Sequence, residues 1–205
     1  MKKFRNINVG IIGLGRITLH HIQNIVREKK ISLISICDLD KSKLSKFSKK
    51  FNVPGYQNFR EMIKKHKNLN LIIIATPSGM HYEHSLEILK RFKKNLIIEK
   101  PLALKIQQCQ KLFDCAKKNK VKIFPVFQNR YNKAVQRVKK SIKSKELGSV
   151  RIVNVRLRWC RPQKYYNLSP WRGTYSHDGG ALTCLLYTSD AADDSLRVDL
   201  GGRRI

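Results

Sequence analysis

The stretch Asn8-Val9-Gly10-Ile11-Ile12-Gly13-Leu14-Gly15-Arg16-Ile17-Thr18 decides the fold. It reads as a short apolar strand, a glycine turn and the start of an amphipathic helix. Gly13 permits a tight turn, and Gly15 lets the backbone approach a pyrophosphate bound at the free N–H groups of the helix. The stretch therefore predicts a dinucleotide-binding turn, with Gly13, Gly15, Arg16 and Ile17 as cofactor-binding residues.

Thr18 stands where the usual fingerprint of this turn has a third glycine. That position governs how closely the helix packs on the strand, so a small residue is expected to serve with slightly looser packing. A Gly-x-Gly pair is weak evidence by itself. Its place between a strand and a helix near the N-terminus strengthens the prediction considerably.

Asp38 follows a second apolar stretch, Ser32–Cys37, about twenty residues beyond the turn. An acid at this place accepts hydrogen bonds from the ribose hydroxyls of the cofactor. Its negative charge would repel a 2′-phosphate, so the sequence favours NAD over NADP. The alternative is that Asp38 caps the helix expected at Lys41–Phe51.

Strand-like and helix-like segments alternate as far as residue 127. The strands are apolar runs and the helices are amphipathic, which is typical of a parallel sheet covered on both faces. Right-handed crossovers make such a sheet doubly wound, so residues 1–127 are predicted to form an NAD(P)-binding Rossmann domain of the α/β class. The predicted strands are 8–13, 32–37, 69–75, 95–98 and 121–127, and the predicted helices are 17–29, 41–51, 59–66, 81–92 and 106–119.

The pattern changes near residue 128. A helix expected at Asn132–Lys145 is followed by Val150–Trp159, in which apolar residues alternate with polar ones. Such alternation is typical of an antiparallel sheet with one face in water. Residues 128–183 are therefore predicted to be the truncated start of an α+β substrate domain.

The chain has 205 residues, 41% of them hydrophobic, and a formal net charge of +29 from 43 Lys and Arg against 14 Asp and Glu. The hydrophobic content is sufficient for a buried core. Lysines occur throughout the predicted helices rather than in one basic tail or an aromatic-basic cluster. We therefore expect solvated basic faces and no nucleic-acid partner. A polyanion-binding surface and steering of an anionic substrate are the alternatives.

No apolar run is long enough to span a bilayer, and the apolar stretch after the basic N-terminus is broken by glycine and arginine, which makes a poor secretory signal. The five cysteines form no Cys-x-x-Cys pair, and their number is odd. A disulfide framework or a metal site is therefore not expected. The expected location is a reducing cytoplasm, without a membrane partner.

Two further segments follow predicted strands, at the edge where a doubly wound sheet binds its ligand. Thr76-Pro77 is expected to lie near the nicotinamide half of the cofactor, and His81 to begin the next helix. Glu99-Lys100-Pro101 follows the strand at 95–98. A lysine beside a nicotinamide ring can polarise or protonate the oxygen that reacts. From the residues alone, a structural His81 and a solvated Lys100 are the simpler alternatives.

Glu99-Lys100-Pro101, together with Gly13–Ile17 and His21, resembles the glucose–fructose oxidoreductase, inositol dehydrogenase and MocA (Gfo/Idh/MocA) family. The resemblance implies an NAD(P)-dependent dehydrogenase that acts on CH–OH groups, with Lys100 as a catalytic residue beside the nicotinamide. It also implies a second domain with a large open antiparallel sheet, and a homo-oligomer. Further positions that match family motifs, and are expected to contact the cofactor, are Thr76, Pro77, His81, Glu99 and Gln128.

A narrower resemblance lies in Trp159–Tyr166 and Trp171–Gly180. It is similar to the branch of the family that oxidises UDP-N-acetyl-2-amino-2-deoxyglucuronate at C3 in surface-polysaccharide biosynthesis. Arginines and tyrosines suit an anionic nucleotide sugar, because arginine pairs with phosphate or carboxylate through two hydrogen bonds. The implied substrate-binding residues are Arg156, Arg161, Tyr165, Trp171 and Arg172.

Residues 184–205 resemble, in one continuous frame, the translation of an adapter used to prepare sequencing libraries. A genuine polar tail is the alternative. The family pattern places a catalytic histidine after this point, so the chain is expected to be inactive or unstable by itself. Two other functions stay open: a dinucleotide-binding module without turnover, and another sugar or inositol dehydrogenase of the same family.

Overall fold

The computed structural model describes residues 6–154 and 162–178. Contacts between Cα atoms divide the chain into a unit that ends at Val126, to which Ser176–Asp178 also belong, and a second unit that begins at Phe127. Among the described residues, no helix is long and apolar enough to cross a membrane. The predicted domain limits of 1–127, 128–183 and 184–205 stay predictions.

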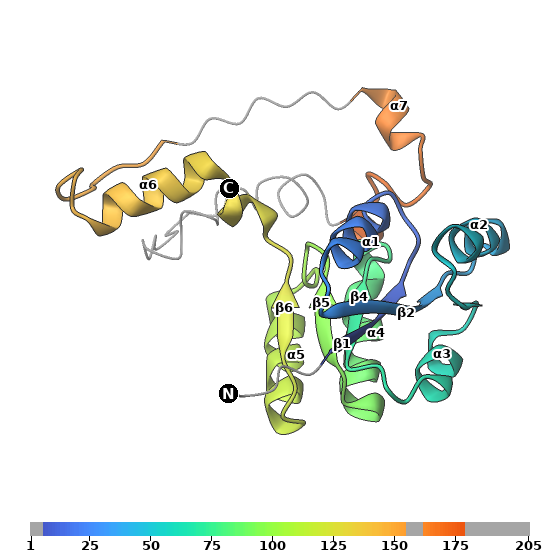
Figure 1. Cartoon of the computed structure of the whole chain (residues 1–205). Coiled ribbons are helices and arrows are strands. Elements are labelled where there is room, and N and C mark those ends of the chain that lie inside the picture. Colours follow the sequence, from blue (N-terminus) through green and yellow to red (C-terminus); the bar gives the residue numbers. More distant parts are fainter. Residues whose placement is uncertain (1–5, 155–161, 179–205) are drawn as a thin grey trace. The chain divides into compact units, whose positions relative to one another are not determined.

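The first unit contains one parallel sheet of six strands (Figure 1). Its spatial order is β3-β2-β1-β4-β5-β6, so the strand order reverses between β1 and β4. This order confirms the predicted doubly wound α/β fold. Ligands of such sheets bind where the strand order reverses. The strands are β1 (Ile7–Ile12), β2 (Ile31–Cys37), β3 (Gly55–Tyr56), β4 (Leu71–Ile74), β5 (Asn95–Ile98) and β6 (Ile123–Pro125).

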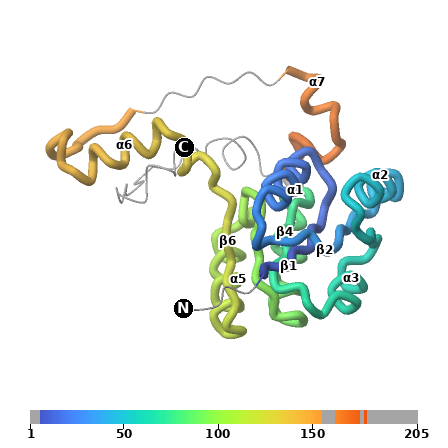
Figure 2. The backbone as a smooth tube through the Cα atoms, in the orientation of Figure 1, coloured from blue at the N-terminus to red at the C-terminus, as the bar shows by residue number. Residues whose placement is uncertain are grey.

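Helices cover both faces of the sheet, as the tube in Figure 2 lets the reader follow. Neighbouring side chains of a strand point to opposite faces, so each face has its own core. Ile73 of β4 belongs to one core, whereas Ile72 and Ile74 belong to the other. The first core lies under α1 (Thr18–Arg27) and α2 (Lys41–Phe51), and the second under α3 (Phe59–Lys65), α4 (His81–Glu87), the π-helical turn η2 (Ile88–Phe92) and α5 (Ile106–Lys118).

Local capping explains why α2 has the predicted bounds. The Asp40 carboxylate accepts hydrogen bonds from the N–H groups of Ser42 and Lys43, at 2.9 and 3.1 Å. These bonds satisfy donors that the first turn of a helix otherwise leaves free. At the other end, Asn52 takes the left-handed conformation, with φ of 51°, that stops a helix.

Two features of the first unit differ from the expected elements. The strand β3 is not predicted, because two residues cannot display a period. The helix expected at 81–92 is divided into α4 and η2, because the last turn widens to π-helical hydrogen bonding.

The second unit begins with η3 (Gln128–Tyr131) and α6 (Lys133–Lys143), followed later by the short helix α7 (Gln163–Tyr166). The short helix α8 (Tyr175–Asp178) comes next in the chain, and its last three residues belong to the first unit. The strand predicted at Val150–Trp159 is not present in its described part, residues 150–154; the rest lies outside the described residues. A strand exists only when its backbone pairs with another strand, and the described part of the second unit holds no such partner.

Candidate active site

Three chain segments that contain predicted site residues leave the sheet at its carboxyl edge. The Gly13 N–H donates to the carbonyl of Cys37 at 2.8 Å, and the Glu99 N–H donates to the carbonyl of Ile74 at 3.0 Å. Asp38 follows Cys37 directly. The glycine turn after β1, Asp38 after β2 and the Glu99 turn after β5 therefore lie on one edge of four neighbouring strands, β2-β1-β4-β5, which include the point where the strand order reverses.

The two glycines of the turn have different surroundings. Gly13 has a φ of +94°, and a Cβ added there would lie 2.6 Å from the backbone carbon and oxygen of Ala75. Only glycine fits this conformation and this close approach. Gly15 is exposed, and a Cβ added there would meet nothing nearer than the Ala75 oxygen at 3.9 Å. Gly13 therefore shapes the turn, while Gly15 leaves open space beside it.

Thr18, at the position of the third glycine, is enclosed between the helix and the turn. The residue is fully buried, and its hydroxyl donates to the Gly13 carbonyl at 2.6 Å. The hydroxyl thus joins the helix to the turn, as expected of a small residue that serves at this position; the slightly looser packing stays a prediction. The helix α1 that follows has no side-chain cap at Ile17, and Arg16 and Ile17 lie exposed beside it. Its N-terminus and the space at Gly15 fit a pyrophosphate.

Asp38 is fixed by two backbone donors. One carboxylate oxygen accepts from the Leu14 N–H at 2.6 Å, and the other accepts from the Asp40 N–H at 2.9 Å. The alternative that Asp38 caps α2 is wrong, since Asp40 has that role. Each oxygen of a carboxylate accepts more than one hydrogen bond, so Asp38 keeps capacity for the ribose hydroxyls of a dinucleotide.

Glu99, at the end of β5, is buried and contacts α1. One carboxylate oxygen lies 2.7 Å from Nε2 of His21, and the other accepts from the Lys100 N–H at 3.3 Å. The Lys100 side chain is half-buried, and the Lys100–Pro101 peptide bond is cis. Glu99, the residue before Lys100, is therefore held against α1, the helix that follows the glycine turn.

His81 begins α4, as predicted, and is only 1% exposed. Its Nδ1 lies 2.7 Å from the Pro101 carbonyl oxygen, and its Nε2 lies 2.8 Å from the Thr76 carbonyl oxygen. Burial lowers the pKa of His81, although the two carbonyls and the nearby Glu99 carboxylate oppose this effect. Both ring nitrogens face backbone, so this side chain joins the Thr76-Pro77 loop to the Pro101 turn.

In the second unit, three residues predicted to bind substrate lie together. The Arg172 guanidinium lies over the rings of Tyr165 and Trp171, at 4.6 and 4.7 Å from their centres, and Nη1 donates to the Tyr165 hydroxyl at 2.6 Å. Arg156 and Arg161, also predicted here, lie outside the described residues. Gln128 is exposed in η3.

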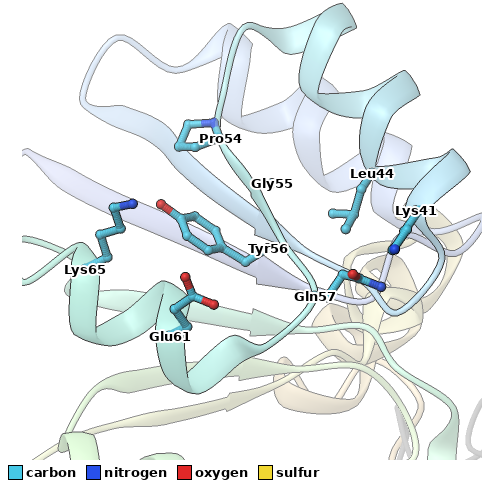
Figure 3. A pocket seen from close by; sticks show the side chains of 8 residues that line it. All are labelled: Lys41, Leu44, Pro54, Gly55, Tyr56, Gln57, Glu61 and Lys65. Carbon is cyan, nitrogen blue, oxygen red and sulfur yellow. The ribbon is translucent and has the colours of Figure 1, made fainter.

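A shallow hollow of about 600 Å³ lies at the β3 edge of the sheet (Figure 3). None of the predicted site residues lines it, so it is separate from the candidate cofactor site. Its lining residues are Lys41, Leu44, Pro54, Gly55, Tyr56, Gln57, Glu61 and Lys65. Among residues 6–154 and 162–178, no group of His, Cys, Asp or Glu side chains is arranged to hold a metal ion.

Two contacts of the site are not found by sequence reasoning. A signal exists for His21, which follows Thr18 by three residues and so shares its inward face of α1. No local signal exists for the contact of His81 with the Pro101 carbonyl, twenty residues further on. That contact depends on how β4 and β5 lie side by side.

Comparison with solved structures gives the same architecture. The WlbA dehydrogenase of Bordetella pertussis, solved in complex with NADH and UDP-GlcNAcA, is 30% identical with a TM-score of 0.88, over 94% of this chain and 56% of that one. A myo-inositol 2-dehydrogenase of Lactobacillus plantarum is 25% identical with a TM-score of 0.65, over 71% of this chain and 43% of that one.

Among curated relatives, the glucose-6-phosphate 3-dehydrogenase of Bacillus subtilis is 29% identical over 150 residues, which are 73% of this chain and 42% of that protein. The chain thus spans about half the length of the proteins it matches. Residues 7–127 match the Gfo/Idh/MocA family, described as an oxidoreductase family with an NAD-binding Rossmann fold. With the glycine turn, Asp38 and the Glu99-Lys100-Pro101 turn on one edge of a doubly wound sheet, the chain belongs to the Gfo/Idh/MocA oxidoreductase family.

Proposed function

We propose that this chain is part of an NAD-dependent dehydrogenase that removes a hydride from a sugar hydroxyl. The observation that carries the proposal is the place of Lys100, in the turn after β5, on the same sheet edge as the glycine turn and Asp38. A bound NAD supplies the hydride acceptor. The Lys100 amine takes the proton of the hydroxyl whose carbon loses the hydride, so that the hydroxyl becomes a carbonyl.

The cofactor is held by residues of the first unit in this proposal. Gly13 and Gly15 shape the pyrophosphate turn, Arg16 and Ile17 flank it, and Asp38 binds the ribose hydroxyls. Asp38 also disfavours a 2′-phosphate, which supports NAD rather than NADP. The remaining residues proposed to contact the cofactor are Thr76, Pro77, His81, Glu99, Lys100 and Gln128. His81 and Glu99 are proposed to act indirectly, by positioning the groups that they contact: the carbonyls of Thr76 and Pro101 for His81, and the His21 ring for Glu99.

The proposed substrate is a UDP-linked amino-sugar uronate, oxidised at C3. This is supported by the similarity to the WlbA dehydrogenase that was solved with UDP-GlcNAcA. It is also supported by Arg172, whose guanidinium lies over Tyr165 and Trp171 and so offers charge beside two aromatic faces. We propose that this cluster, with Arg156 and Arg161, binds the anionic parts of the substrate, and that residues 128–183 begin the substrate domain.

The cofactor half of the proposal is tested on the chain itself by NADH fluorescence titration. Asp38→Ala is expected to weaken NADH binding by about tenfold, the loss of one or two hydrogen bonds to a charged acceptor, and to narrow the preference for NADH over NADPH. Asp40→Ala is the matched control, because it removes a neighbouring carboxylate that caps α2 and has no proposed contact with the ribose. Equal binding by Asp38→Ala and the unsubstituted chain would exclude the ribose role.

The catalytic half requires the complete open reading frame that contains this chain. Oxidation of UDP-N-acetylglucosaminuronate is followed by NADH absorbance, and Lys100→Met is expected to lower kcat by about 10²-fold or more. Glucose 6-phosphate and myo-inositol serve as comparison substrates. NADH binding with no turnover of any of these sugars would favour a dinucleotide-binding module instead.

A further inference from the structure

The Glu99-Lys100-Pro101 turn is contacted on both sides by histidines from different helices. His21, on α1, contacts the Glu99 carboxylate that precedes Lys100. His81, on α4, contacts the Pro101 carbonyl that follows Lys100. Lys100 therefore lies between two fixed points, one attached to each helix.

The first contact joins the turn to the cofactor helix. His21 and Glu99 are 2.7 Å apart, with side chains 18% and 9% exposed, so little water competes for this contact. Glu99 also accepts from the Lys100 N–H, which fixes the carboxylate relative to the backbone of the turn. Glu99 therefore attaches the backbone of the turn to α1, the helix that follows the glycine turn.

The second contact depends on how many N–H groups His81 carries. Its two ring nitrogens face carbonyl oxygens of Thr76 and Pro101 at 2.8 and 2.7 Å. A neutral imidazole has one N–H donor, so it bonds only one of the two carbonyls, whereas a protonated ring bonds both. The other titratable groups that act on this ring are Glu99 and His84.

We infer that His21 and His81 are positioning residues that set where the Lys100 amine stands. They act through Glu99 and Pro101 rather than by touching the substrate. The inference rests on the proposed role of Lys100 as the catalytic residue. It goes beyond that role by assigning the geometry of the turn to two side chains outside it.

The test that needs no turnover measures the Lys100 amine directly. Lysines of the chain are labelled competitively with acetic anhydride at a series of pH values, and peptide mass spectrometry gives the rate for each amine. In His21→Leu, the acetylation rate of the Lys100 amine is expected to change about twofold or more. A twofold change corresponds to the weakest interaction energies that residues in contact usually show. His21→Gln, whose amide can donate to Glu99, is expected to restore it. Lys46, exposed on α2, is the internal control.

His81→Gln is the second variant, since a leucine at this fully buried site risks unfolding the chain. Its long amide can reach one carbonyl, so the Lys100 rate is expected to change and the Lys46 rate to stay constant. Lys100 rates that equal those of the unsubstituted chain in both His21→Leu and His81→Gln would overturn the inference.

A second measurement separates this inference from the proposed function. In the complete protein, His21→Leu is expected to lower kcat and shift its pH profile, with the NADH dissociation constant changed less than kcat. If Lys100→Met retains turnover, the proposed function fails. If Lys100→Met abolishes turnover but both histidine variants keep the normal kcat and pH profile, only the positioning role fails.

Discussion

At the scale of single residues, the turn after β1 contains two glycines that belong to the same sequence motif but have different surroundings in the structure. Gly13 is enclosed by the backbone of Ala75 and has a positive φ, whereas Gly15 faces open space. The first glycine is thus required by the folded chain itself, and the second by the ligand that approaches it.

Gly13→Ala is expected to lower the free energy of unfolding by about 3 kcal/mol, because a left-handed backbone and an overpacked contact add. Gly15→Ala is the matched control: it should change that free energy by less than about 1 kcal/mol and weaken NADH binding by about tenfold. Urea unfolding and NADH fluorescence measure the two effects. Equal stability losses in both variants would contradict the distinction.

One buried histidine, His81, and one half-buried histidine, His84, determine a predicted pH dependence of stability. Burial lowers the pKa of His81 and of His84 below the ordinary value of 6.5. The unfolded chain then binds protons that the folded chain does not, so this contribution to stability is complete above pH 6.5 and is lost as the pH falls toward the lowered values.

The free energy of urea unfolding is therefore expected to decrease as the pH falls below about 6.5, because the histidines of the unfolded chain bind protons before those of the folded chain do. His84→Gln should reduce this pH dependence, because one of the two groups is removed. A steeper pH dependence in His84→Gln than in the unsubstituted chain would contradict the assignment.

Site residues that belong to a local sequence pattern could be predicted from the sequence. Gly13, Gly15 and Asp38 are found because the turn and the acid have fixed places relative to two strands. The partners of Thr18 and His81 are not found. No sequence pattern shows that the Thr18 hydroxyl donates to the Gly13 carbonyl, and the contact of His81 with Pro101 joins segments that only the folded chain brings together. The positions were thus predictable, but their partners were not.

At the scale of elements, long periodic segments were predictable and short ones were not. The bounds of α2 and β5 agree with the predictions because a cap and flanking polar residues limit them. The two-residue β3 exists only because it pairs with β2. The strand expected at Val150–Trp159 shows the opposite case, in which alternation alone gives no strand in the described residues.

Ser35 is a strand residue whose replacement is expected to stabilise the protein. Ser35, in β2, is fully buried, and no described residue makes a hydrogen bond with its hydroxyl. An unsatisfied buried hydroxyl costs about 1–3 kcal/mol, so Ser35→Ala is expected to raise the free energy of unfolding, by up to about 1 kcal/mol once the lost packing is counted. Ser35→Val tests the space available. A lower thermal midpoint for Ser35→Ala would show that the hydroxyl is satisfied.

At the scale of the whole molecule, the first unit contains every proposed cofactor-binding residue except Gln128. Both hydrophobic cores and all six strands lie before residue 127. A length near 127 residues is typical of a domain with its own core. The unit is therefore expected to fold independently of the rest of the chain.

A chain that ends at Phe127 is expected to unfold cooperatively in urea and to bind NADH within about threefold of the longer chain, a difference below 1 kcal/mol. Far-ultraviolet circular dichroism and NADH fluorescence measure this. The substitution Gly13→Ala in the shorter chain is the control for specific binding. Loss of the cooperative transition would show that residues after 127 are part of the same folding unit.

The position of β1 in the middle of the sheet has a consequence for the order of events during synthesis. Val9 pairs with Leu71, which is made 62 residues later. At a usual rate of 5–20 residues per second, roughly 3 to 12 s pass between the two. Throughout that interval β1 has at most β2 beside it, and the glycine turn lacks the Ala75 backbone against which it packs.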